Sequence, residues 1–268
     1  MTPQSSISNA TGVTVLKLGG ELIDAPADRA RTADAVAALA RTSRLVVVHG
    51  GGRAIDAELT RRGIEPVKQD GIRVTDEATL ETVVAVLAGV ANTTLVAALG
   101  ARGVRAVGLT GADAGLGLSE RVTSMDTVSG RVVDPGLVGR PDGGASASVI
   151  DHLCTAGYVP VIASIGVTRD GELLNVNADV MAAHVAAAIG AVRLLVAGGT
   201  AGVLDHAGNR IDALDAGALD AMLADGTATA GMIAKLRACR TARDAGVMDV
   251  RIVDGRDATL AFGTVLQT

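Results

Sequence analysis

Short runs of Val, Leu and Ile recur along the chain and constrain its fold more than any other feature. They cover residues 13–18, 45–49, 104–109, 159–163, 193–197 and 249–253. Each run is typical of a strand that is buried on both faces. Ala-rich stretches with a period of 3.6 residues predict helices at residues 28–42, 52–62, 76–101, 144–156, 178–189, 215–224 and 230–245. This alternation predicts an α/β fold, a three-layer αβα sandwich with a mainly parallel central sheet.

The segment 117–143 interrupts the alternation. Short segments around Arg121–Thr123 and Arg131–Val133 flank the turn residues Ser129–Gly130, which is typical of a β-hairpin. The residues Thr168–Gly171 indicate a second hairpin. We therefore expect β-hairpins that protrude from the layers.

Composition excludes several classes of partner. With a net charge of −5, one Tyr, one Phe and no Trp, the chain lacks the basic surface and the stacking aromatics of nucleic-acid-binding proteins. No uninterrupted apolar run approaches the roughly 20 residues of a membrane span, and the first twelve residues do not resemble a secretory signal. We therefore expect a cytoplasmic protein with no nucleic-acid or membrane partner.

The cysteines and histidines do not form a framework for disulfides or metals. Cys154 and Cys239 lie far apart within predicted helices, which favours two reduced packing residues. The four histidines are dispersed, and no Cys/His cluster has the spacing of a zinc site. We expect no metal held by the protein itself.

The chain shows no linker rich in Pro or Ser and no internal repeat. Any boundary between lobes therefore lies inside one continuous core. We place it near residue 165, which divides the chain into an N-terminal lobe, 1–165, and a C-terminal lobe, 166–268.

Two glycine loops follow the first two predicted strands. The first strand ends with Lys17, followed closely by Gly19 and Gly20, and the second runs through His49 into a triple glycine at 50–52 before a predicted helix. Glycines allow close backbone approach, a lysine neutralises phosphate charge, and a helix N-terminus stabilises an anion. The loops contain neither a Walker A sequence nor a dinucleotide fingerprint. They predict a site for a phosphate or a carboxylate, in which His49 is a structural residue.

The two loops resemble those of the amino acid kinase family, and specifically of acetylglutamate kinases. The resemblance extends almost from end to end. Further matching segments are Gly71–Thr75, Ala88–Asn92, Val107–Gly111, Gly157–Val161, Ser164–Val167, Asn175–Asp179 and Gly231–Lys235.

The resemblance implies catalytic roles for Lys17, Lys235 and Asp179. The two lysines would stabilise charge on the transferring phosphoryl group, and Asp179 would hold the lysines in place. These roles agree with the physics of phosphoryl transfer, in which positioning and electrostatics supply most of the catalysis. A carboxylate acceptor, with a pKa of about 4.3, is already ionised and needs no general base.

The resemblance also implies the binding residues. The substrate would be bound by Gly51, Gly52, Arg73 and Asn175, because glycine N–H groups, a guanidinium and an amide suit carboxylates and an N-acetyl group. Asn177 is expected to cap a helix instead. ATP, with the Mg²⁺ that it carries, would bind mainly to the C-terminal lobe, and the N-terminal lobe would bind the acylated amino acid and form a homodimer. The expected nucleotide contacts are Gly19, Gly20, Gly199, Thr200, Ala201, Gly202, Val203, Leu204, Thr227, Ala228 and Thr229.

One nucleotide position departs from the family pattern. Relatives carry a Ser/Thr-Asp-Val segment after the fifth core strand, whereas this chain has glycine, Gly199, in place of the aspartate. The expected activity is phosphorylation of the side-chain carboxylate of N-acetyl-L-glutamate, the second step of arginine biosynthesis. Two alternatives stay open: a kinase for an N-modified or carrier-bound 2-aminoadipate or glutamate, and a non-catalytic regulatory relative.

Overall fold

The fold is built on a central sheet of eight strands, seen in a computed structural model that describes residues 12–126, 131–143, 147–224 and 230–267. The strands lie in the order β14-β16-β15-β13-β1-β2-β10-β5. All neighbouring pairs are parallel except β15 and β16. The strands are β1 (Val13–Leu18), β2 (Arg44–His49), β5 (Ala106–Thr110), β10 (Val159–Ala163), β13 (Arg193–Gly198), β14 (Ala213–Leu214), β15 (Asp249–Asp254) and β16 (Gly263–Leu266).

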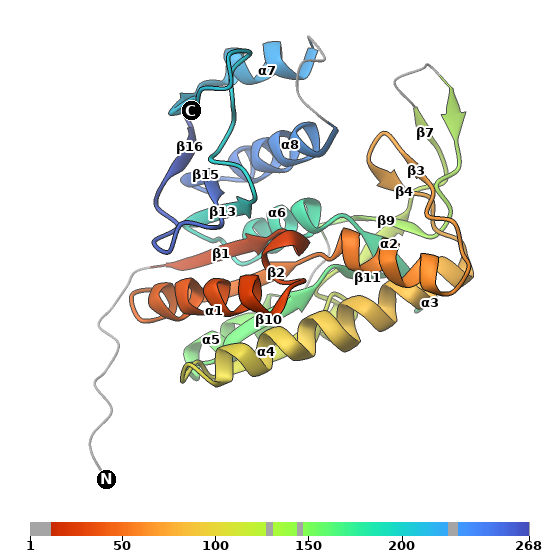
Figure 1. Cartoon of the computed structure of the whole chain (residues 1–268), viewed down its shortest axis with the longest axis horizontal. Helices are drawn as coiled ribbons and strands as arrows, with labels where there is room; N and C mark the ends of the chain where they lie inside the picture. The colour runs from red at the N-terminus through yellow and green to blue at the C-terminus, as the bar shows by residue number, and fades with distance from the viewer. Residues whose placement is uncertain (1–11, 127–130, 144–146, 225–229, 268) are drawn as a thin grey trace.

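Helices cover both faces of this sheet, which confirms the predicted αβα sandwich (Figure 1). On one face lie α1 (Pro26–Ala40) and α4 (Asn92–Gly100). On the other lie α5 (Ser148–Thr155), α6 (Ala178–Ala188) and α8 (Ala230–Asp244), with α7 (Ala216–Ala224) beside α8. Short turns and helices near the strand ends are η1 (Gly20–Leu22), α2 (Gly52–Arg61) and η3 (Asp113–Gly115).

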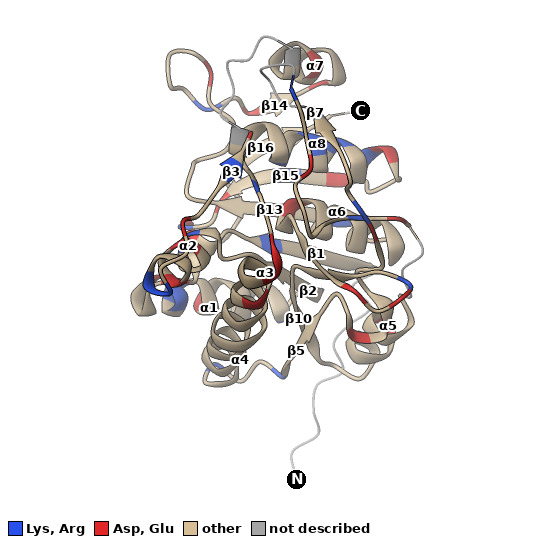
Figure 2. Cartoon of the chain, turned by 90° about the vertical axis from the view of Figure 1, so that its right-hand side faces the viewer, with Lys and Arg blue, Asp and Glu red and all other residues tan. Residues whose placement is uncertain are grey.

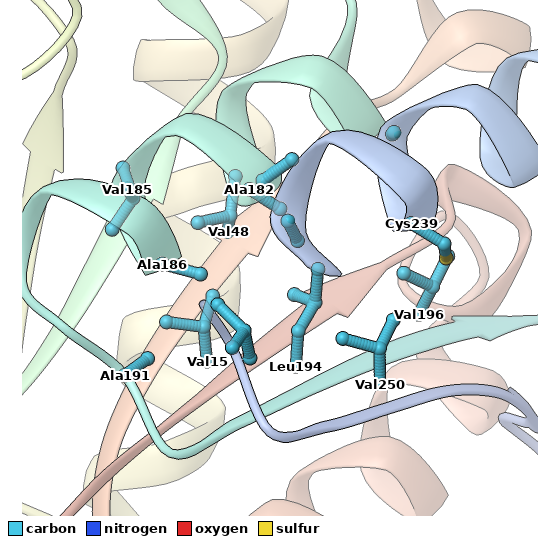
Figure 3. Packing of buried hydrophobic residues seen from close by; sticks show 14 of the residues in the cluster. Val15, Val48, Ala182, Val185, Ala186, Ala191, Leu194, Val196, Cys239 and Val250 are labelled. Carbon is cyan, nitrogen blue, oxygen red and sulfur yellow. The ribbon is translucent and has the colours of Figure 1, made fainter. Parts of the chain in front are cut away.

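The largest apolar cluster lies between the sheet and α6 and α8 (Figure 3). Val15 lies beside Ala186 of α6 and Val196 lies beside Cys239 of α8, and all four are fully buried. The small alanine side chains of α6 allow that helix to lie close to the sheet. Both cysteines are buried and free, as predicted, and burial raises the pKa of Cys154 to about 11, so this thiol stays protonated and inert.

The stretch predicted as one helix at 76–101 is α3 (Glu77–Val84), a π-helical segment η2 (Ala85–Ala91) and α4 in direct succession. Asp76 caps it, because its carboxylate accepts a hydrogen bond from the N–H of Thr79 at 2.8 Å. By length and composition the helix Glu77–Gly100 could cross a membrane, with a mean hydropathy of 2.0. Leu95 and Leu99 are fully buried in the cluster that α4 shares with α1 and the sheet, so one face of this helix packs into the core.

Both predicted regions contain a hairpin, but the first strand of the first hairpin was predicted in the wrong place. That hairpin pairs β7 (Met125–Asp126) with β8 (Val132–Val133), and Arg121 of the predicted strand pairs with β9 instead. The expected turn, Ser129–Gly130, lies outside the described residues. The second joins β11 (Ile165–Val167) to β12 (Leu173–Val176). These two strands, β9 (Val138–Pro141) and β6 (Ser119–Arg121) form a four-stranded sheet, and β3 (Lys68–Gln69) and β4 (Ile72–Arg73) form a further hairpin that the sequence did not predict.

The prediction that every core strand is buried on both faces was wrong for β5. Its residues are half-buried or exposed, and Gly108 is exposed. The reason is position, because β5 pairs only with β10 and lies at the edge of the sheet.

The division into lobes at residue 165 remains a prediction. The central sheet runs without a break from β1 of the first proposed lobe to β13 of the second, with Lys17 opposite Val196 in the register.

Candidate active site

A cavity of about 250 Å³ lies at the carboxyl ends of β1 and β2. In parallel α/β sheets this edge is where ligands bind, because loops and helix N-termini converge there. The hairpins β3–β4 and β7–β8 and the start of α3 lie on the same side of the molecule, which faces the viewer in Figure 2. The lining includes most residues predicted for substrate and catalysis, namely Lys17, Gly51, Gly52, Arg73, Asn175 and Asp179, and two predicted nucleotide contacts, Gly19 and Gly20.

The two glycine loops meet in this cavity. A Cβ on Gly20 would lie only 2.8 Å from the Cα of Gly51, so a larger residue at position 20 would push the loops apart. Gly51 precedes α2 without a side-chain cap, which leaves the first N–H groups of the helix available to a ligand. The loops therefore provide backbone donors at a site that favours negative charge.

Lys17 and Asp179 form a buried ion pair at one wall of the cavity. Lys17 lies in β1 and Asp179 in the first turn of α6, and the Nζ and Oδ1 atoms are 2.8 Å apart. The two side chains are only 7% and 8% exposed, and the contact does not have the angles of a hydrogen bond. Because the pair is held by a strand and a helix, the ammonium is fixed before any substrate arrives.

Lys235 does not share this pair. It lies on α8 and is half-buried, and its Cε comes within 3.4 Å of the position that a Cβ on Gly198 would occupy. Among the described residues no ion pair joins it to Asp179. The resemblance implies that Asp179 holds both lysines, but the structure places only Lys17 in contact with it.

Arg73 enters the cavity from the β3–β4 hairpin, and its side chain is 6% exposed. Nη2 is 2.6 Å from Oδ1 of Asp56 and donates to the carbonyl of Gly52 at 3.1 Å. Nη1 is buried and has no hydrogen-bond partner among the described residues. An unpaired guanidinium N–H is costly, and a carboxylate bound in the cavity would satisfy it.

Asp56 holds two cations in place at this end of the cavity. Its burial would raise the pKa of the carboxyl group, but hydrogen bonds from Lys68 and Arg73 outweigh burial and lower it. Lys68 is 2.6 Å from Asp56 and also lines the cavity. The pair of cations suits a carboxylate ligand.

The two asparagines have different roles, as predicted. Asn177 caps α6, because its side-chain oxygen accepts from the N–H of Asp179 at 2.8 Å. Asn175 lines the cavity, and its Nδ2 donates to the hydroxyl of Thr75 at 3.1 Å. Its amide oxygen makes no hydrogen bond to the described residues, so it can accept one from a ligand.

His49 is a structural residue, as the sequence predicts. It is fully buried, Nε2 accepts from the Asn92 amide at 3.1 Å, and Nδ1 donates to the carbonyl of Gly50 at 3.2 Å. Burial lowers the pKa of His49 to about 4. The neutral ring therefore ties the glycine loop to the core.

The predicted nucleotide residues are only partly brought together. Gly19 and Gly20 line the cavity, and the segment from Gly199 to Leu204 follows β13. Val203 is fully buried and its N–H donates to the Thr264 hydroxyl at 2.8 Å, so its side chain belongs to the core. Thr227, Ala228 and Thr229 lie outside the described residues.

Sequence reasoning missed Glu21, Asp56, Lys68 and Ser164, which lie in or beside the cavity. One signal was available for Lys68. The whole sequence contains three lysines, and they are Lys17, Lys68 and Lys235. Two line the cavity and the third lies beside Gly198, so the rarity of lysine marks the site.

Comparisons with known proteins agree with this geometry. Residues 12–254 match the model of the amino acid kinase family. Acetylglutamate kinase from Sphingopyxis alaskensis is 42% identical over 247 residues, covering 90% of this chain and 82% of that protein. Acetylglutamate kinase from Novosphingobium aromaticivorans is 43% identical over 220 residues, covering 79% and 72%. The crystal structure of smu.665 from Streptococcus mutans has a TM-score of 0.80 and 26% identity, covering 95% of this chain and 98% of that chain.

Proposed function

This chain belongs to the amino acid kinase family, and we propose that it uses ATP to phosphorylate the side-chain carboxylate of N-acetyl-L-glutamate. The observation that best supports this substrate is the 42% identity with an acetylglutamate kinase over 90% of the chain. The reaction is transfer of a phosphoryl group to a carboxyl group, which places the enzyme in the second step of arginine biosynthesis.

The charges of the cavity suit a substrate with two carboxylates. Arg73, with its unpaired Nη1, and Lys68 would bind the α-carboxylate. Asn175 would accept a hydrogen bond from the N-acetyl amide. The side-chain carboxylate would lie near the N–H groups of Gly51 and Gly52, where the helix N-terminus reduces repulsion from the nucleotide.

The chemical step needs no proton transfer from the protein. An oxygen of the ionised carboxylate attacks the γ-phosphorus of ATP, the bond to the bridging oxygen breaks, and ADP leaves with that electron pair. Negative charge on the equatorial oxygens would be stabilised by Lys17 and Lys235 from opposite sides. Asp179 keeps the first of these lysines in position.

The nucleotide would bind as its Mg²⁺ complex, because phosphoryl transfer from ATP generally requires the cation to neutralise the phosphates. The predicted contacts for this complex are the glycines after β1 and the residues that follow β13. The N-terminal lobe would hold the acylated amino acid and the C-terminal lobe the nucleotide.

A homodimer formed through the N-terminal lobe, in the cytoplasm, completes the proposal. The outer surface of the long helix supports the dimer, because Val90 is 66% exposed. The same helical stretch contributes Ala88, Thr93 and Val96 to a hollow that the edge strand β5 also lines. An apolar helix face next to an unpaired strand edge is typical of an interface between subunits.

Substitution of Arg73 tests the substrate assignment. Arg73→Lys keeps the charge but loses the planar pair of donors, so the KM for N-acetylglutamate should rise by about tenfold or more while the KM for ATP stays within about twofold. Coupled measurement of ADP release gives both constants. An unchanged KM for N-acetylglutamate would remove Arg73 from the substrate site.

A further inference from the structure

A carboxylate, that of Glu21, lies in the cavity that we assign to anionic ligands. Glu21 belongs to η1, directly after the first glycine loop. Its Oε1 accepts a hydrogen bond from the N–H of Gly199 at 2.9 Å, so it bridges the ends of β1 and β13. A negative charge here opposes phosphate binding unless a cation offsets it.

Glycines around Glu21 make room for its carboxylate. A Cβ on Gly19 would lie 2.5 Å from both carboxylate oxygens, and a Cβ on Gly198 would lie 3.5 Å from Oε1. A Cβ on Gly199 would be 3.5 Å from Cγ of Glu21 and 3.1 Å from the Arg256 guanidinium. The glycine that replaces the aspartate of relatives thus lies against a carboxylate supplied from another element.

Two cations approach this carboxylate, Arg256 beside Gly199 and Lys235 beside Gly198, and Lys235 is the one to which the proposed function gives a catalytic role. A Cβ added to Gly198 would lie 3.4 Å from Cε of Lys235 and 3.5 Å from Oε1 of Glu21, so both side chains approach the same point. Within the described residues Lys235 has no hydrogen bond or ion pair, and Oε2 of Glu21 accepts no hydrogen bond. Lys17 and Lys68, in contrast, are each paired with an aspartate.

We propose that Glu21 is the positioning residue for Lys235, and that their ion pair closes across Gly198 to aim the ammonium at the transferring phosphoryl group. This inference rests on the proposed kinase activity. A lysine has a long flexible side chain, so an anchored ammonium needs less reorganisation in the transition state than a free one. The Glu21–Lys235 pair and the Lys17–Asp179 pair would then lie on opposite sides of the transferring phosphoryl group.

Kinetics of Glu21→Gln provide the first test. Glutamine keeps the volume and an acceptor for the Gly199 N–H but removes the charge. We expect kcat to fall by about tenfold or more and the KM for N-acetylglutamate to change by less than about twofold. The matched control is Glu77→Gln, which removes an exposed carboxylate from the first turn of α3 and should leave both constants unchanged.

Lysine NMR provides a readout that does not depend on the substrate. Labelling of the three lysines gives three ε-methylene signals, which are assigned with Lys235→Arg and Lys68→Arg. We expect Glu21→Gln to shift the signal of Lys235 and to leave that of Lys68 in place. Acyl phosphate formation by the unmodified enzyme from N-acetylglutamate and ATP, trapped with hydroxylamine as a hydroxamate, decides separately whether the proposed function holds.

Three results would overturn the inference. The first is a Lys235 signal that does not move in Glu21→Gln, and the second is a moved signal with unchanged kcat. The third is an unchanged kcat with a raised KM for Mg·ATP, which would assign Glu21 to the cation carried by the nucleotide.

Discussion

Replacing Lys17 with methionine should destabilise the fold by about 3 kcal/mol, because it leaves Asp179 buried without its cation. Breaking a buried ion pair costs roughly 3–5 kcal/mol. We expect the low end of that range, since Asp179 lies in the first turn of α6, where the helix dipole offsets part of its charge. Turnover should be lost in the same variant.

Urea unfolding at pH 7 measures this effect, and Lys68→Met is the matched control. Lys68 also pairs with an aspartate, but its side chain is 42% exposed, so its removal should cost less than about 1 kcal/mol. The double variant Lys17→Met/Asp179→Asn removes both charges and should be less destabilised than the sum of its single variants.

Two results would refute this reasoning. One is equal destabilisation by Lys17→Met and Lys68→Met. The other is strict additivity in the double variant, which would mean that the two buried charges do not stabilise each other.

Two further predictions concern His49 and the subunit interface. Burial lowers the pKa of His49 from 6.5 to about 4, so the unfolded chain binds more protons than the folded chain between these pH values. The free energy of unfolding therefore rises with pH through this window and should be about 2 kcal/mol lower at pH 5 than at pH 7. Urea unfolding of His49→Asn should lose that part of the pH dependence, and an identical slope would contradict it. Val90→Asp should convert a dimer into monomers in sedimentation analysis without unfolding them, and an unchanged assembly would place the interface elsewhere.

The central strands could be predicted almost residue by residue. The bounds Val13–Leu18 and Val159–Ala163 match the apolar runs, because a parallel strand covered on both faces is apolar at most of its positions. The exposure of β5 and the pairing of β3, β14 and β16 could not be predicted. These short strands are fixed by the neighbours that tertiary structure brings to them and leave little trace in local composition.

The site residues that belong to a recognisable sequence motif could be predicted. Lys17, Arg73, Asn175 and Asp179 come from three separate segments and line one cavity. Glu21 was not predictable, because its role depends on the distance between η1 and the end of β13. The Glu21 carboxylate lies beside Gly199, which replaces the aspartate of relatives, only because the fold brings the two positions together. Their spacing in the sequence gives no sign of this contact.

Acyl phosphate formation from ATP and Mg²⁺, trapped with hydroxylamine, tests the central claim most directly. N-acetylglutamate, N-acetyl-2-aminoadipate and free glutamate are compared side by side at equal concentration. The account predicts hydroxamate from N-acetylglutamate at a rate at least about tenfold above the other two, because the chain is 42% identical to an acetylglutamate kinase over 90% of its length. A preference for the aminoadipate, or no product from any of the three, would contradict it.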